Sequence, residues 1–270
     1  MYSGLVLTKY SGRVMGTHQK IDRVARKHLA EIIDNNDDFP SIKELLEFEG
    51  KNGPDGIKRK SPSYNEPWHF LNPLANDNSN FMKLLDTHYT GLVKHLKDGN
   101  HEACAFEASW LAHAIVDGLT PAHHYPYDEK LSEMLVDGKE GRNSIKTKLL
   151  FMGETKLKTL QNTYKAYGPR GLMTAHVAFE YGVALLIKPL GLPDARPVDT
   201  DFDELEQWGY RDYFMNRAKE VAVLDIYEQY LASGWTSKLS NRVRHSLLPV
   251  LVKSVTMLWY SAMKEAGKIK

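Results

Sequence analysis

The sequence predicts an all-α fold, organised as a single domain over residues 1–270. Apolar residues recur at helical spacing along almost the whole chain, and no series of alternating segments indicates a sheet. The composition, 42% apolar and 26% charged, is typical of a globular domain with one core. The chain also lacks a Gly-rich phosphate loop and a Ser-centred nucleophile elbow, so neither kind of active site is expected.

The first two predicted helices are identified by their start signals. Apolar residues three and four apart form a stripe along 17–34, and Thr17 is placed to cap that helix. Ser41 begins a shorter helix that runs to Phe48, and Glu44 three residues later completes a capping box.

A long polar connection separates these helices from the next two. Residues 50–80 are rich in Gly, Pro and Asn, and a structureless stretch of this length inside a domain usually carries function. Helices follow near 80–98 and 100–118. The second contains small residues that permit close helix packing: Ala103, Ala105, Ala108, Ala112 and Ala114. Cys104 lies among them and is expected to be a buried, inert thiol.

The C-terminal half is predicted to be helical with one further long connection, at 189–203. The predicted helices cover 127–137, 143–166, 170–188, 211–233 and 240–266. The last one carries a core stripe of Leu247, Leu251, Val255, Leu258 and Met263. Pro249 is expected near its first turns or at a kink, because proline cannot donate the backbone hydrogen bond of a helix interior.

Charge and cysteine content narrow the function classes. A net charge of +1 provides no global basic field that would hold nucleic acid. A single cysteine excludes an internal disulfide and a multi-cysteine zinc site, so any metal must be held by His, Asp and Glu. No apolar run approaches the ~20 residues that span a bilayer, and residues 1–9 lack the apolar region of a signal peptide. We therefore expect no transmembrane segment, and a cytoplasmic location unless a leader has been removed.

The segment 113–123 contains the strongest functional signal. His113 and Asp117 are four residues apart and share one face of the predicted helix. His123 follows just past Gly118 and Pro121, where the helix should end. Two imidazoles and a carboxylate at one place are ligands that zinc takes. Taken alone, this segment is also compatible with His113 as an ordinary hydrogen-bonded core histidine.

Further candidates make this a larger set. His176 and Glu180 form a second pair four residues apart, His18 stands at the start of the first helix, and Asp55 and His69 lie in the first long connection. Together these residues are sufficient for more than one metal ion. Neighbouring cations repel unless anions lie between them, and a carboxylate among the ligands must then act as a bridge. Asp117, in the central pair, is well placed to do so.

Several of these candidates have a structural interpretation beside the functional one. His18 is also compatible with a first-turn residue, Asp55 with a Pro-Asp-Gly turn, and the pair His176 and Glu180 with an exposed helix pair, but metal ligation is the favoured interpretation of each. His124 competes with His123 as a ligand if the register differs by one residue. The remaining histidines have no partner at metal spacing.

The order of these residues resembles the zinc-dependent phospholipase C family and the related single-strand-specific nucleases. The resemblance rests on His18, Asp55, His69-Phe70, His113-x-x-x-Asp117-x-x-x-Pro121-x-His123 and His176-x-x-x-Glu180. It is supported by the surroundings of His18, by Trp110-Leu-Ala before His113 and by Leu258-Trp259-Tyr260, and it is spread over roughly residues 16–260.

The resemblance implies a three-zinc site at the bottom of an all-helical cleft. By carry-over, the first zinc would be held by Asp55, His69, His113 and Asp117, the second by His123, His176 and Glu180, and the third by His18 and the bridging Asp117. In the family, the mature N-terminal residue completes the third site through its amino group and carbonyl.

The chain departs from the family at three places. Bacterial phospholipases of this type begin with Trp after leader removal, whereas this chain begins with Met1. Because the N-terminal residue completes the third zinc site in the family, two or three zinc ions are expected here. A long segment, 124–175, separates His123 from His176 and is predicted to be a helical insertion near the cleft mouth. Choline-selective members carry aromatic residues where this chain has Gly56 and Glu66, so the resemblance does not imply a choline preference.

The expected activity is zinc-dependent hydrolysis of a phosphodiester, with a phospholipid as the favoured substrate. Metal-bound water would attack phosphorus, and Asp55 would accept its proton or serve only as a ligand. One alternative is a nuclease-like enzyme with Tyr64 and Trp68 as stacking platforms, and another is a non-catalytic lipid- or partner-binding domain. The basic run Lys58-Arg59-Lys60 has two interpretations. It is either a solvated loop or a segment that attracts a polyanion or an anionic lipid surface, the latter in peripheral membrane contact.

Overall fold

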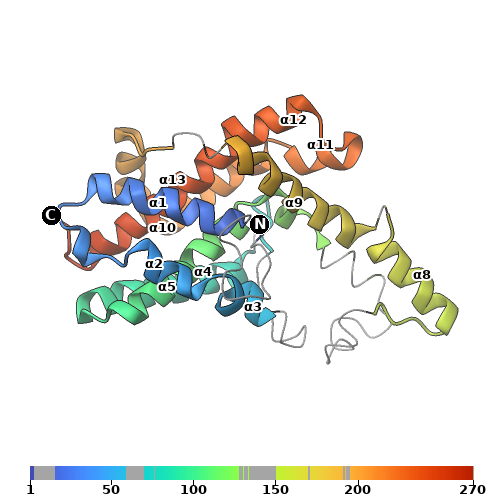
Figure 1. Ribbon diagram of the computed structural model, residues 1–270, viewed down its shortest axis with the longest axis horizontal. Coiled ribbons are helices and arrows are strands. Elements are labelled where there is room, and N and C mark those ends of the chain that lie inside the picture. Colours follow the sequence, from blue (N-terminus) through green and yellow to red (C-terminus); the bar gives the residue numbers. More distant parts are fainter. Residues whose placement is uncertain are drawn as a thin grey trace.

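The computed structural model describes residues 1–2, 16–58, 70–75, 77–127, 130, 133, 150–169, 171–190, 192 and 195–269. The described residues form helices and connections without any strand, which confirms the all-α prediction (Figure 1). The α-helices are α1 (Thr17–Ile32), α2 (Ile42–Leu45), α3 (Pro54–Lys58), α4 (Ser79–Asp98), α5 (His101–Gly118), α8 (Lys156–Tyr167), α9 (Leu172–Leu190), α10 (Asp199–Ala222), α11 (Ile226–Ser233), α12 (Ser237–Arg242) and α13 (Leu248–Glu265). Most of the predicted helix 127–137, and residues 143–149 of the next, lie outside the described residues.

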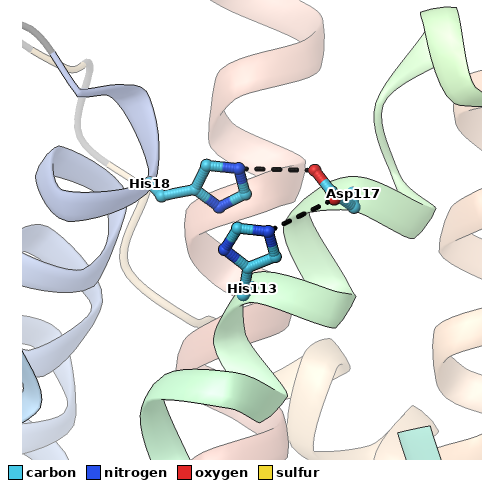
Figure 2. A group of neighbouring side chains, drawn as sticks. All are labelled: His18, His113 and Asp117. Carbon is cyan, nitrogen blue, oxygen red and sulfur yellow. Dashed lines mark ion pairs between the residues drawn. The ribbon is translucent and has the colours of Figure 1, made fainter. Parts of the chain in front are cut away.

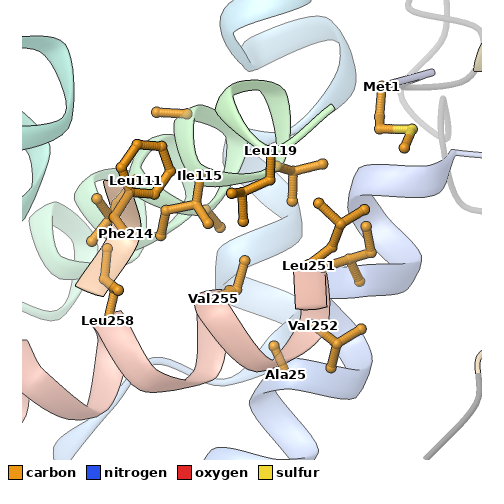
Figure 3. Packing of buried hydrophobic residues seen from close by; sticks show 14 of the residues in the cluster. Met1, Ala25, Leu111, Ile115, Leu119, Phe214, Leu251, Val252, Val255 and Leu258 are labelled. Atoms are coloured by element: carbon orange, nitrogen blue, oxygen red, sulfur yellow. The ribbon is translucent and has the colours of Figure 1, made fainter. Parts of the chain in front are cut away.

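Helix α13 is the centre of the core. It packs against α1, α4, α5 and α10, and its predicted core stripe is fully buried. Figure 3 shows Leu251, Val255 and Leu258 of α13 facing Leu111 and Ile115 of α5. Large-to-small changes in such a core cost about 2–5 kcal/mol each. This packing therefore stabilises the positions of α1 and α5, which carry His18, His113 and Asp117.

The small residues of α5 allow the close packing that the sequence predicts. Ala108 is fully buried, and its carbonyl accepts a 3.0 Å hydrogen bond from the Trp259 indole of α13. Cys104 is buried as predicted, and burial raises the pKa of its thiol to about 11. The thiolate, the reactive form, is therefore scarce at neutral pH.

The start of α1 differs from its prediction. Thr17 is the first helical residue rather than the cap, and the N-cap position is Gly16, with no side-chain hydrogen bond. The backbone N–H of Thr17 instead donates to the carbonyl of Tyr2 at 2.6 Å. A chain segment from outside the helix thus accepts from one of the first-turn N–H groups, which have no partner within the helix. The predicted capping box of Ser41 and Glu44 is confirmed.

Two helix boundaries in the middle of the chain also differ. The connection 50–80 contains a 3-10 turn, Gly50–Asn52, and α3, so Asp55 lies in a helix and not in a turn. Helix α8 begins at Lys156, and residues 150–155 are not helical, because the Thr155 side chain caps the helix at this point by accepting from the Lys158 N–H.

The helices of the C-terminal half begin and end at other residues than predicted. Helix α10 starts at Asp199, within the predicted connection, and Gly209 interrupts it with a positive φ of 72° that glycine adopts without strain. Helix α12, a π-helical turn at Val243–Leu247 and α13 follow one another directly, and the turn accommodates Pro249 at the start of α13.

One described helical run, Ser237–Glu265, is long and apolar enough to cross a bilayer, with a mean hydropathy of 1.3 in its best window. That window is 67% buried inside the protein, so its apolar composition is accounted for by the core.

Candidate metal centre

Asp117 lies at the centre of the site. One carboxylate oxygen, Oδ1, is 3.3 Å from His18 Nε2, and the other, Oδ2, is 3.4 Å from His113 Nε2 (Figure 2). The two imidazole rings stack in parallel, 3.9 Å apart. All three side chains are buried, so each oxygen of one carboxylate faces a different histidine away from bulk water.

The sequence around Asp117 fixes this geometry locally. Asp117 follows His113 by one helical turn, and α5 ends at Gly118, where a Cβ atom would collide with Phe81 and Phe214. Pro121 then starts a short 3-10 helix, Pro121–His124, that turns the chain back. His123 is returned in this way to the carboxylate, with its Nδ1 3.6 Å from Asp117 Oδ1.

A second group forms beside the first. His123 and His176 place Nε2 at 3.0 and 3.1 Å from the same oxygen, Oε1 of Glu180. His176 and Glu180 come from one face of α9. In each of the two groups (His18, His113 and Asp117; His123, His176 and Glu180), one ligand atom per residue lies within 4.8 Å of the others, which suits a metal ion.

The N-terminal residue lies between the two groups. The amino nitrogen of Met1 donates to Asp117 Oδ1 at 2.6 Å and is 3.2 Å from Glu180 Oε1, and its carbonyl oxygen is 2.9 Å from His18 Nε2. Burial lowers the pKa of this amine, but the two carboxylates outweigh burial and raise it to about 10. Met1 thus places a backbone amino group and a carbonyl beside the ligands, at the position that Trp occupies in the bacterial phospholipases of the resemblance.

Asp55 lies at the edge of the centre. Its Oδ1 is 3.8 Å from His113 Nε2, and its side chain is 30% exposed, compared with 4% for Asp117. His69 lies outside the described residues, as do Tyr64, Glu66 and Trp68. The structure thus brings together seven of the eight predicted ligands: His18, Asp55, His113, Asp117, His123, His176 and Glu180.

Two buried acids behind His113 were not predicted. Glu49 Oε1 is 3.6 Å from His113 Nδ1, on the ring edge opposite Asp117, and Glu49 also accepts hydrogen bonds from Gln19 and Ser109. Asp22 is buried, and burial together with Glu49 raises its pKa well above the ordinary range. The sequence did carry one signal, because Asp22 follows His18 by four residues on a predicted helix. No comparable local signal marks Glu49.

The charges of the centre favour a bound cation. Burial raises the pKa of Asp117 and Glu180, but the Met1 ammonium and neighbouring histidines outweigh it and hold both pKa values well below the usual range. Both carboxylates are therefore ionised at neutral pH and converge with imidazole nitrogens in a buried space. This donor set fits zinc, which prefers His nitrogens and carboxylate oxygens.

A cavity of about 240 Å³ adjoins His123. It is lined by the aromatic residues Phe70, Tyr125 and Tyr127 and by polar residues that include Asn72 and Asn78. The backbone N–H of Leu71 donates to the carbonyl of His123 at 3.2 Å and holds this wall against the second ligand group.

Neither a family model, a curated protein nor a solved structure matches this chain.

Glu49 provides a first test of the centre. We expect Glu49→Gln to weaken metal binding by about 10–100-fold, because the carboxylate behind a ligating histidine fixes the orientation and basicity of the ring. Competition with a chromophoric chelator measures this affinity. The matched control is Glu47→Gln, an exposed acid two residues away that should leave the affinity unchanged. Equal affinities in the two variants would contradict the role of Glu49.

Proposed function

We propose that the chain is a zinc-dependent phosphodiester hydrolase, similar to phospholipase C, that cleaves a phospholipid to diacylglycerol and a phosphorylated headgroup. The observation that carries the proposal is the placement of Asp117, whose two oxygens face different sets of ligands. A carboxylate in this position would neutralise the repulsion between two neighbouring cations. The resemblance of the ligand order to the phospholipase family supports the same function.

The proposed ligands fall into three sets. Asp55, His113 and Asp117 would hold one zinc together with His69, while His123, His176 and Glu180 would hold another. The third would be held by His18, Asp117 and the amino group and carbonyl of Met1. Bound zinc supplies a Lewis acid for the phosphate oxygens and lowers the pKa of a bound water toward neutrality.

Asp55 is the residue proposed to accept a proton from the attacking water. It is the most exposed carboxylate of the described ligand set, with a side chain 30% exposed, compared with 4% for Asp117 and 12% for Glu180. A general base must reach both water and the reacting phosphate, and the edge position of Asp55 allows this.

The corresponding test is Asp55→Asn. We expect kcat for a soluble chromogenic phosphodiester to fall by about 10²–10⁴-fold, the usual contribution of a general base. Zinc content of the His123 group should be retained, since Asp55 does not contribute to it. Asp37→Asn, an exposed acid in a 3-10 turn, is the control. A variant with wild-type kcat and full zinc content would exclude Asp55 as the base.

A substrate panel tests the proposed function itself. The zinc-loaded protein is assayed with phospholipid vesicles, single-stranded DNA and a chromogenic phosphodiester. Release of phosphorylated headgroup from the phospholipid supports the proposal, whereas cleavage of DNA alone would favour the nuclease-like alternative. A fully zinc-loaded protein that hydrolyses none of them would leave the non-catalytic binding domain as the better account.

A further inference from the structure

Helices α8 and α9 present a row of exposed apolar side chains. On α8, Leu157, Leu160 and Tyr164 are 65%, 66% and 67% exposed. Their spacing of three and four residues places them on one face of the helix. On α9, Val177, Tyr181 and Leu185 are also exposed, at intervals of four residues. We call these six residues the α8–α9 surface.

The position of α8 makes this surface accessible. Figure 1 shows α8 at the end of the molecule farthest from α1, α2 and α4, connected to the remainder through α9. The opposite face of α8 is anchored by buried Asn162 and Ala166. The apolar face of α8 is thus left in contact with solvent, although burying it would be favourable.

Basic residues flank the apolar row. Lys156, Lys158 and Lys165 on α8 and Lys188 on α9 are all exposed. Among the described residues of 150–188, Glu154 is the exposed acid, whereas Glu180 points into the metal centre. An apolar helix face bordered by lysines is the arrangement by which helices lie in the interface of an anionic membrane.

The same helix connects this surface to the metal centre. Val177 and Tyr181 each follow a ligand of the second group, His176 and Glu180, by one residue, which is about 100° of rotation around α9. The Tyr181 ring also contacts the ring of Tyr2 edge-on, with centroids 5.5 Å apart. Tyr2 follows Met1, whose amine lies in the centre. The apolar row therefore extends to residues adjoining the ligands.

We propose that the α8–α9 surface binds an anionic lipid surface and so presents the metal centre to lipid headgroups. This proposal rests on the proposed function, because it concerns how a phospholipid substrate would reach that site. The apolar side chains would enter the outer part of the bilayer, and the lysines would contact anionic headgroups.

Vesicle co-sedimentation tests the proposal with the intact chain. Wild type is expected to bind vesicles of phosphatidylcholine and phosphatidylserine more tightly than vesicles of phosphatidylcholine alone, and more weakly at high salt. The triple variant Leu157→Gln, Leu160→Gln, Tyr164→Gln should lose about tenfold or more in vesicle binding. Its zinc content and its hydrolysis of a soluble phosphodiester should not change. The matched control is the double variant Leu74→Gln, Val223→Gln, which alters exposed apolar residues elsewhere.

The outcomes separate this inference from the proposed function. Unchanged vesicle binding by the triple variant, or no binding by wild type, would overturn it. So would a dimer in solution that the triple variant dissociates, since a second copy would then cover the surface. Vesicle binding that is lost in the triple variant would support the lipid-binding surface even if the zinc-loaded protein hydrolysed no phosphodiester, in which case only the proposed function would fail.

Discussion

Asp117→Asn is expected to abolish zinc binding at the centre and phosphodiester hydrolysis together. The amide keeps the shape of the side chain but removes the negative charge that would lie between two cations. It also replaces one carboxylate oxygen with an NH2 group, which donates hydrogen bonds and does not accept them. Oδ1 contacts the Met1 amine and His18, and Oδ2 contacts His113, so the change removes an acceptor from one of these two places. In the metal-free protein the Met1 ammonium would lose its nearest anion, and breaking a buried ion pair costs about 3–5 kcal/mol.

Zinc content by elemental analysis and hydrolysis of a chromogenic phosphodiester check this result. Glu102→Gln, an exposed acid in the first turn of the same helix, should leave both unchanged. Circular dichroism establishes that each variant remains helical. Full zinc content with full activity in Asp117→Asn would refute the bridging role of Asp117.

Blocking the Met1 amine is the second change with a large expected effect. Adding one glycine before Met1 moves the free amine away from Asp117, and the new peptide nitrogen has no lone pair to donate. Met1 is 2% exposed, so the extended chain must also displace buried side chains (Figure 3). We expect the number of bound zinc ions to fall by one and the activity to fall with it.

A chain carrying the same glycine after Lys270 is the control for this experiment. Unchanged zinc stoichiometry in the N-terminally extended protein would show that the amine is not a ligand. The metal-free protein provides a second readout. The pKa of the Met1 amine rises from 8.0 to about 10 on folding, so its stabilising effect is complete below pH 8 and is lost as pH rises through 10. This corresponds to about 3 kcal/mol of unfolding free energy, which the extended chain should lack over the same pH window.

The fold was predictable where local periodicity and burial agree. The stripe of Leu251, Val255 and Leu258 specifies α13, because an apolar face of this spacing has to be buried. The start of α1 was not predictable in the same way, since the acceptor for the Thr17 N–H comes from Tyr2 across a segment that no local pattern connects to it. The positive φ of Gly209 was not predictable either, because this glycine lies within an otherwise helical pattern.

The candidate site was likewise predictable where it depends on local spacing and not where it depends on tertiary packing. The pairs His113 and Asp117, and His176 and Glu180, follow from helix geometry alone. The positions of Glu49 behind His113 and of Met1 between the two groups depend on tertiary packing. Spacing in the sequence indicates which residues share a helix face, but it contains no information on which faces of different helices meet.

Anomalous X-ray diffraction at the zinc edge, on crystals of the zinc-loaded protein, tests the central claim most directly. Our account predicts a zinc ion at each of the three proposed ligand sets, with Asp117 Oδ2 bound to the ion on the His113 side and Oδ1 bound to the ion on the His18 side. It would be contradicted by a map without zinc at these residues, or by one in which Asp117 contacts a single ion through one oxygen while the other oxygen faces only protein.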